Sequence, residues 1–260
     1  MILRRLGNKK KIAKEIQKHF PPHKIYIEPF FGAGGMFFNK PKAKYNIVND
    51  LDSDVFNLFQ VVMNQKEELE KAFYMMPIHS DLLDYWKKNQ ENEPIKKALR
   101  FLFLSNLINP MTGDIKRRVY CNDKNIVLLN LNLTYDFLKN TNINLFNEDF
   151  VKFIKTIYWD DKNRPLQKEN SFIYCDPPYL GTNDNYSNSF TKEQSESLFN
   201  TLQETKCKFA MSEFDHPFIL EQAEKRGLNI IIIGERQNLK NRRTEILITN
   251  YENNQQSLFA

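Results

Sequence analysis

The sequence predicts an α/β protein in which helices cover both faces of a largely parallel β-sheet. Short β-rich runs alternate along the chain with stretches of helical periodicity, which is the pattern of βαβ units. Three of the eight glycines cluster directly after the first of these runs, where a tight turn is expected. The run Ile230–Ile233 contains no polar residue, so we expect a strand that is buried on both faces.

Seven β-strands are expected. In chain order they are Lys24–Glu28, Tyr45–Val48, Asn144–Phe146, Phe172–Cys175, Lys208–Met211, Asn229–Ile233 and Glu245–Asn250. The polar stretch Glu235–Arg243 separates the last two, which predicts an antiparallel hairpin at one edge of the sheet.

Helix signals lie between these strands. Ile12, Ile16 and Phe20 recur at four-residue intervals and predict a helix over Lys9–Phe20. Thr191 and Gln194 match a capping box, which predicts the start of another helix. From about residue 65 to 144 the strand–helix alternation stops, and helical stretches surround a polar, Asn-rich segment. We therefore expect residues 1–64 and 145–260 to form the sheet domain, and residues 65–144 to form an inserted helical subdomain.

The composition is that of a globular protein, with 41% hydrophobic residues and a net charge of +5. No apolar run approaches the ~20 residues of a membrane span. The N-terminus lacks the apolar core of a secretory signal. Three cysteines and four histidines are scattered along the chain. We therefore expect a cytoplasmic protein with no disulfide framework and no metal site.

Three short basic clusters bear on the partner: Lys9–Lys11, Lys116–Arg118 and Lys240–Arg243. One such cluster alone is typical of solvated surface. Three of them in a chain with 13% aromatic residues indicate nucleic acid as a partner. Lys116, Arg117 and Arg118 form the densest cluster of the insertion, within a polar loop suited to a DNA groove, and are expected to contact DNA.

Ligands of an open α/β sheet bind beyond the carboxyl ends of the strands, and two motifs fall there. Glu28–Gly35 follows the first strand, and its glycines let backbone N–H groups approach a ligand ahead of a helix N-terminus. Asp50 ends the second strand, where a carboxylate can accept hydrogen bonds from ribose hydroxyls. The alternatives are an ordinary turn and, for Asp50, the N-cap of the next helix.

A third motif, Asn147–Phe150, follows the third expected strand. Asp149 is suited to an exocyclic amine, and Phe150 is suited to packing on a purine. The alternative is that these residues cap and anchor a helix.

The strongest motif is Asp176-Pro177-Pro178-Tyr179, directly after an apolar strand. Two consecutive prolines give a rigid turn without N–H donors, so its carbonyls and the Asp176 carboxylate are pure acceptors. Such a site suits an amino group, which has two N–H donors. Tyr179 offers a planar face on which a base can stack.

In this order, the motifs resemble those of the Dam-like (D12, alpha group) S-adenosylmethionine-dependent adenine-N6 DNA methyltransferases. The N-terminal Gly7-Asn8-Lys9 is similar to the short Gly-x-Lys motif of that family. The resemblance covers residues 1–60 and 145–250. It implies a Rossmann-like methyltransferase fold that transfers the methyl group of S-adenosylmethionine to adenine N6 in duplex DNA after base flipping. Alternatives are a cytosine-N4 or RNA adenine methyltransferase, or a non-catalytic nucleic-acid-binding relative.

The resemblance also implies which residues serve the reaction. The catalytic set is Asp176, Pro177, Pro178 and Tyr179. The set expected to bind S-adenosylmethionine is Gly7, Lys9, Pro29, Phe30, Gly32, Gly34, Asp50, Asp149, Phe150 and Asp176. The loop Gly181–Phe190 is expected to close over the flipped base.

Two features qualify the resemblance, and a third points to a further partner. Arg5 stands where relatives often have an aromatic residue near the cofactor, so a different packing is expected there. The stretch Asn106–Asn125 does not reproduce the recognition hairpin of the family, so GATC specificity is not expected. The tail Gln255–Phe259 resembles peptides that dock on bacterial sliding clamps, and the alternative is that Leu258 and Phe259 pack on the protein itself. A protein bound to DNA would be found with the nucleoid.

Overall fold

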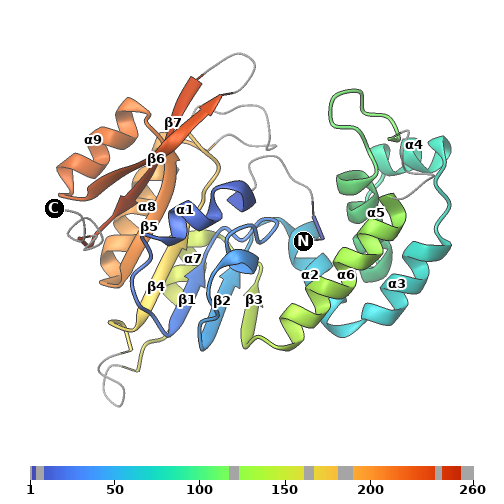
Figure 1. Ribbon diagram of the computed structural model, residues 1–260, viewed down its shortest axis with the longest axis horizontal. Helices are drawn as coiled ribbons and strands as arrows, with labels where there is room; N and C mark the ends of the chain where they lie inside the picture. The colour runs from blue at the N-terminus through green and yellow to red at the C-terminus, as the bar shows by residue number, and fades with distance from the viewer. Residues whose placement is uncertain are drawn as a thin grey trace.

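A mixed seven-stranded sheet forms the centre of the fold, in the order β3-β2-β1-β4-β5-β7-β6 (Figure 1). The computed structural model describes residues 2–3, 9–116, 123–160, 167–180, 190–237 and 242–252. The strands are β1 (Ile25–Glu28), β2 (Tyr45–Asn49), β3 (Ile143–Phe146), β4 (Ser171–Cys175), β5 (Lys208–Phe214), β6 (Asn229–Gln237) and β7 (Arg242–Thr249). Strands β1 to β5 run parallel, whereas β7 is antiparallel to both β5 and β6. The predicted α/β fold with an antiparallel edge hairpin is confirmed.

Helices cover the sheet on both faces. The helices of the described residues are α1 (Ala13–Gln17), α2 (Ser53–Asn64), α3 (Lys66–Met75), α4 (Ser80–Lys88), α5 (Pro94–Asn106), α6 (Lys124–Lys139), α7 (Phe150–Thr156), α8 (Lys192–Thr205) and α9 (Pro217–Lys225). On one face, residues such as Phe199 of α8 and Ile219 of α9 pack with Ile173 and Met211 of the sheet. The opposite face is covered by the N-terminal segment and α2. The site edge of the sheet is therefore held between two packed layers.

Helices α3 to α6 follow α2 and occupy the side of the molecule away from β6 (Figure 1). Leu69, Leu102 and Leu131 of these helices belong to the same hydrophobic cluster as Tyr26 of the central sheet. Strand β3 begins at Ile143, within the range expected for the insertion. The division at residues 65 and 144 stays a prediction.

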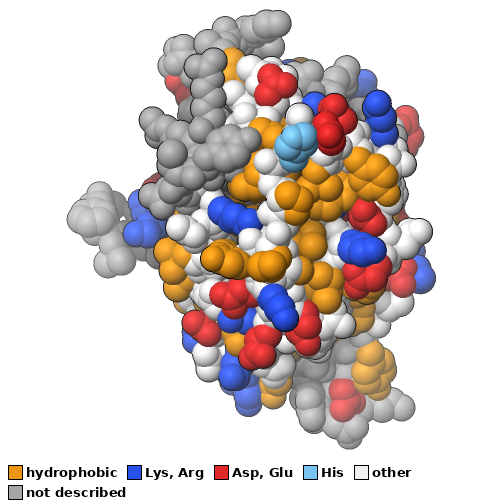
Figure 2. Space-filling view, turned by 90° about the vertical axis from the view of Figure 1, so that its right-hand side faces the viewer, with side chains coloured by type: hydrophobic (Ala, Val, Ile, Leu, Met, Phe, Trp, Pro, Cys, Tyr) orange, Lys and Arg blue, Asp and Glu red, His pale blue; other side chains and the backbone are white. Residues whose placement is uncertain are grey.

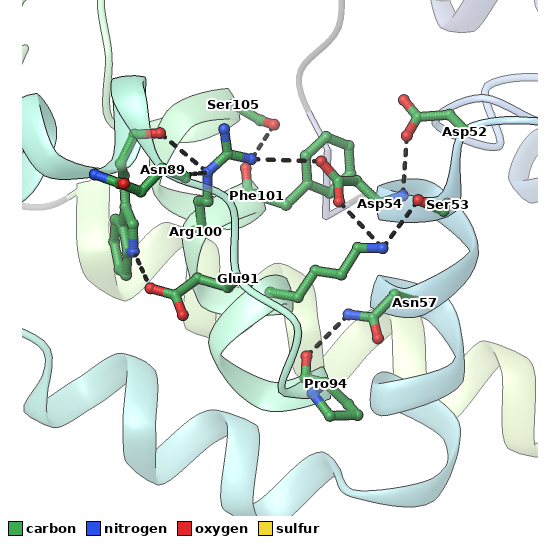
Figure 3. A network of polar contacts seen from close by, with 12 residues as sticks. Asp52, Ser53, Asp54, Asn57, Asn89, Glu91, Pro94, Arg100, Phe101 and Ser105 are labelled. Carbon is green, nitrogen blue, oxygen red and sulfur yellow. Dashed lines mark hydrogen bonds and ion pairs between the residues drawn. The ribbon is translucent and has the colours of Figure 1, made fainter.

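The N-terminal end of α2 is tied to α5 by a polar network (Figure 3). Asp54 lies 3.6 Å from Lys97 Nζ and 3.5 Å from Arg100. Lys97 also donates to Ser53 Oγ at 2.9 Å. Arg100 Nε donates to the backbone carbonyls of Trp86 and Asn89, at 3.0 and 2.8 Å. Helix α5 thus holds α2, the helix that follows the second strand.

Two expected elements differ from the structure. The helix expected over Lys9–Phe20 is a 3₁₀ turn, η1 (Lys9–Lys11), followed by the short helix α1. The expectation that Ile230–Ile233 is buried on both faces is wrong, because Ile230 and Ile232 are 40% and 73% exposed. Strand β6 is the outermost strand, and its alternate residues Ile231 and Ile233 pack on the core while the other two face outward.

The face of the molecule turned toward the viewer in Figure 2 carries a broad band of hydrophobic side chains, with acidic and basic side chains interspersed. Exposed apolar residues of the inserted helices include Tyr74, Met75, Leu129 and Leu133. Among the described residues, no helix is long and apolar enough to cross a membrane.

Candidate active site

The candidate site lies at the carboxyl ends of β1, β2 and β4, which are neighbours in the sheet. Ile27 of β1 pairs with Ile173 of β4, and Glu28 pairs with Val48 of β2. The segments that follow these strands carry the glycine turn, Asp50 and Asp176. Parallel strands end at the same edge, so motifs far apart in the sequence are brought to one place, as the motif analysis predicts.

Asp50 shapes the glycine turn. Its carboxylate accepts hydrogen bonds from the backbone N–H of Gly32 at 2.5 Å and of Asp52 at 2.8 Å. Asp52, not Asp50, is the N-cap of α2, accepting from Asp54 N at 2.9 Å. The N-cap interpretation of Asp50 is therefore wrong. Each carboxylate oxygen has further lone-pair capacity for hydroxyl groups of a ligand.

The two glycines of this turn that are expected to bind the cofactor have different surroundings. Gly32 has φ +53°, and a side chain added there would meet nothing within 4 Å, so the turn borders open space. Gly34 has φ +70°, and a Cβ there would come 2.5 Å from the Phe38 ring, so this glycine is required for packing. The helix expected to start at this turn is only a 3₁₀ turn, η2 (Phe37–Asn39), so the expectation of a helix N-terminus facing a ligand is wrong.

An aromatic cluster lies beside this turn. Phe30 and Phe150 have ring centroids 5.4 Å apart, and Phe190 lies 6.1 Å from Phe30 and 5.9 Å from Phe150. Asp149 caps α7, accepting from Val151 N at 2.9 Å, as the alternative interpretation of this motif expects. The structure thus brings Phe30 and Phe150 together.

Asn49 is a site residue that the motif analysis missed. Its side-chain amide donates to the carbonyl of Pro29 at 3.1 Å and to that of Glu148 at 2.9 Å, and its Oδ1 accepts from Glu148 N at 2.9 Å. One buried side chain therefore holds together the turns that follow β1, β2 and β3. An amide in an apolar strand, directly before Asp50, is the signal that could have found it.

Lys9 lies at the catalytic motif. Its Nζ is 2.7 Å from Asp176 Oδ1 and 3.2 Å from Glu245 Oε1, and its side chain is only 3% exposed. The same ammonium lies 4.3 Å from the centroid of the Tyr179 ring. The Lys9 expected near the cofactor thus pairs with Asp176.

Tyr179 is held on several sides. Its hydroxyl donates to Glu245 Oε1, and its ring meets the edge of Phe214 with centroids 4.6 Å apart. Burial, reinforced by the carboxylates of Asp176 and Glu245, raises the pKa of the Tyr179 hydroxyl, so it stays protonated and donates. The ring is 8% exposed.

Glu213 supports the end of the Asp-Pro-Pro-Tyr motif from β5. Its carboxyl accepts hydrogen bonds from Leu180 N at 3.0 Å and from Phe214 N at 2.8 Å. Burial raises the pKa of Glu213 to about 8, against the lowering effect of these two bonds. Glu213 and Glu245 were missed in the motif analysis because they lie inside apolar strands; a carboxylate in such a run is the signal.

Glu28 completes the group of carboxyls at this edge. It is 2% exposed and accepts a hydrogen bond from the Tyr26 hydroxyl at 2.8 Å. Burial raises the pKa of Glu28 well above its usual range, and the charge of Asp176 acts in the same direction.

Several expected site residues lie elsewhere or outside the described residues. Lys116 donates through Nζ to the carbonyl of Asn106, the last residue of α5. Pro29 and Pro177 are buried, and Pro178 is half-buried. Gly7, Arg117, Arg118, most of the loop 181–190 and the tail 255–259 lie outside the described residues. Within the described ranges, no group of three or more His, Cys, Asp or Glu side chains could hold a metal ion.

This arrangement defines a class of protein. A sheet of order 3-2-1-4-5-7-6, with acceptor groups and a tyrosine ring at the carboxyl ends of its central strands, is a Rossmann-like methyltransferase fold. The profile of the family described as D12 class N6 adenine-specific DNA methyltransferase matches residues 6–239. The chain belongs to this family, whose methyl donor is S-adenosylmethionine.

Similar proteins carry related names. A DNA adenine methylase of Haemophilus influenzae is 30% identical over 66% of this chain and 61% of its own length, so the match spans less than two thirds of that relative. The DNA adenine methylase of Escherichia coli K12 is 27% identical over 74% of this chain and 71% of its own. The solved rRNA methyltransferase aviRa of Streptomyces viridochromogenes covers 92% of this chain and 82% of its own, with 8% identity and a TM-score of 0.36. This last similarity is too low to carry an argument.

Proposed function

We propose that this protein transfers the methyl group of S-adenosylmethionine to the N6 amine of an adenine flipped out of duplex DNA. The observation that carries the proposal is the Asp176 carboxylate beside the Tyr179 ring, at the end of β4 in a family of adenine-specific DNA methyltransferases. Adenine is favoured over cytosine by the Asp form of the motif. Further support comes from the segments that follow β1, β2 and β3.

The residues around the glycine turn fit the methyl donor. Open space borders Gly32, and the Asp50 carboxylate lies next to it, at hydrogen-bonding distance from the Gly32 N–H. Phe30 and Phe150 supply apolar rings for the adenine moiety of the donor. When bound there, S-adenosylmethionine supplies a methyl group on a cationic sulfur. Gly7, Pro29, Gly34 and Asp149 stay proposed members of this site.

Asp176 would act on the amine. The N6 lone pair of adenine is delocalised into the ring, so the nitrogen is a weak nucleophile. An acceptor contact from Asp176, with the carbonyl of Pro177, would hold the N–H bonds and stabilise positive charge as it develops on nitrogen. Lys9 Nζ, 2.7 Å from Asp176 Oδ1, would hold this carboxylate in place.

Tyr179 would stack on the flipped base. Base–aromatic stacking is worth about 1–3 kcal/mol, comparable to the few kcal/mol that flipping costs. Arg243, whose guanidinium lies 5.4 Å from the Phe214 ring centroid, brings a positive charge to this side of the site. Contacts of Lys116, Arg117 and Arg118 with DNA, and of the tail with a sliding clamp, remain predictions.

The proposal is tested by methyl transfer itself. Sequencing the DNA of a methylation-deficient host that expresses the protein would identify the modified base and its sequence context. Duplex and single-stranded DNA and RNA of that sequence are then compared in single-turnover reactions with labelled S-adenosylmethionine. We expect methylated adenine in duplex DNA, and a loss of at least about a hundredfold in rate for Asp176→Ala.

A matched control is Asp136→Ala, which removes an exposed carboxylate from α6. It should retain the parental rate. Normal turnover by folded Asp176→Ala would refute the assignment of the active site, and methylation of cytosine or RNA alone would refute the substrate.

A further inference from the structure

Glu245 comes from a part of the chain that none of the catalytic motifs includes. It lies in β7, the antiparallel strand between β5 and β6, and pairs across the ladder with Phe214. Its side chain is 1% exposed. A carboxylate buried so deeply requires partners, and its partners are the residues of the proposed site.

The contacts of Glu245 converge on one oxygen. Oε1 accepts the Tyr179 hydroxyl and lies 3.2 Å from Lys9 Nζ. Lys9 in turn lies over the Tyr179 ring, at 4.3 Å from its centroid. Phe214, the ladder partner of Glu245, meets the same ring edge to face at 83°. Glu245 therefore holds the hydroxyl end of the Tyr179 ring, and Lys9 and Phe214 pack against the ring.

We propose that Glu245 is a positioning residue of the methyl-transfer reaction, which holds the Tyr179 ring in place so that a flipped base can stack on it. This inference rests on the proposed function. Rotation about the Cα–Cβ bond of a tyrosine moves its hydroxyl, so a hydrogen bond there opposes that movement. The hydroxyl lies on the Cβ–Cγ axis, so the plane of the Tyr179 ring is set by its packing with Lys9 and Phe214. Preorganising the ring before the base arrives reduces the ordering cost of capture.

The carboxylate acts through tyrosine and not on the base. Its Oε1 already contacts Tyr179 and Lys9, and its side chain is 1% exposed. Removal of Glu245 should therefore weaken capture of the flipped base, while binding of S-adenosylmethionine at the glycine turn is unchanged.

A double-mutant cycle of Glu245→Ala and Tyr179→Phe tests this proposal. Flipping is measured by 2-aminopurine fluorescence in a duplex carrying the modified sequence, and methyl transfer by single-turnover rates on the natural duplex. Each single variant should lose about tenfold in both, and the double variant should lose no more than the larger single loss, because both remove the same hydrogen bond. The dissociation constant of S-adenosylmethionine should stay within about twofold of the parent.

Glu245→Gln is the conservative variant, because its amide oxygen still accepts the Tyr179 hydroxyl. We expect it to retain more flipping than Glu245→Ala. Glu221→Gln, in an exposed pair with Lys225 on α9, is the matched control and should behave as the parent. If Glu245→Ala does not fold, Tyr179→Phe supplies the test with β7 intact, because it removes the same hydrogen bond. It should then lose about tenfold in flipping while the affinity for S-adenosylmethionine stays within about twofold of the parent.

The proposal is overturned if the losses multiply, or if the Glu245 variants match the parent in flipping and rate. It is also overturned if affinity for S-adenosylmethionine falls together with flipping, since that would indicate a general structural role. The activity of the parent protein separates failure of this inference from failure of the proposed function. If the parent is active and the Glu245 variants are unaffected, only the role of Glu245 is refuted. If the parent is inactive, both are refuted.

Discussion

Two polar networks of the molecule contain the same kinds of side chain and differ in burial. Around Tyr179, Lys9 and Glu245 are 3% and 1% exposed and lie 3.2 Å apart. Between α2 and α5, Lys97 and Asp54 are 22% and 28% exposed and lie 3.6 Å apart. Water screens the partly exposed pair and not the buried pair. The same two kinds of charged group therefore interact with different strength in the two networks. The buried network holds the residues of the candidate site in place, whereas the half-exposed network links helix α2 to helix α5.

The largest effect is expected at Glu213, and it depends on pH. Its pKa is about 8 in the folded protein, above the ordinary 4.5, so the folded state keeps a proton that the unfolded chain loses. The free energy of unfolding should therefore fall as pH rises from about 4.5 to 8 and level off above it. Between pH 6 and 8 this carboxyl alone would cost about 2–3 kcal/mol.

Glu213→Gln, followed by urea unfolding from pH 5 to 9, checks this expectation. The amide cannot accept from both Leu180 N and Phe214 N, so at pH 6 the variant should be less stable by about 1–3 kcal/mol. At pH 9 the gap should narrow or reverse, since the parent then carries a buried charge. Parallel pH profiles of parent and variant would contradict the assigned pKa.

A smaller effect is expected at Arg100. Arg100→Ala removes the ion pair with Asp54 and two hydrogen bonds to the carbonyls of Trp86 and Asn89, and should lower the free energy of unfolding by about 1–2 kcal/mol. Arg100→Lys should recover less than half, because a lysine keeps the charge and lacks the Nε donor. Full recovery by lysine, measured by urea unfolding, would show that charge alone matters here.

The smallest effect is expected at Asp54. Asp54→Asn removes two ion pairs at 3.5 and 3.6 Å, and should cost less than about 1 kcal/mol. Raising the salt concentration to 0.5 M should reduce the difference from the parent further. If Asp54→Asn and Glu213→Gln lower the free energy of unfolding by similar amounts, side-chain exposure does not explain the difference between the two networks.

The fold was predictable from local pattern, and its errors have a physical origin. Glycine, proline and strand signals located all seven strands and the edge hairpin. The burial of Ile230–Ile233 could not be predicted, because an apolar run does not reveal whether a strand ends up central or outermost. The helix ahead of β1 was predicted too long, since spacing of Ile12, Ile16 and Phe20 fits a 3₁₀ turn and short helix equally well.

The site was predictable where a motif occupies consecutive residues. Asp176 and Tyr179 were found by their sequence, and Lys9 by its similarity to a short motif. Asn49, Glu213 and Glu245 were missed because their importance comes from contacts across the sheet, with residues 20 to 99 positions away. Strand periodicity indicates which residues of a strand are buried. The order of the strands in the sheet decides which buried polar groups lie next to one another.

The place of β7 in the sheet has a consequence for how the chain folds. This strand enters between β5 and β6, although it follows both in the sequence. Its contacts with β5 span long stretches of chain, and such nonlocal pairings form slowly, after local helices such as α3 to α6. A chain cut before residue 242 would hold the glycine turn and the Asp-Pro-Pro-Tyr turn, yet leave an unpaired edge on β5 and the Tyr179 hydroxyl without Glu245. The pairing of β7 with β5 that completes the sheet therefore also places Glu245 beside Tyr179.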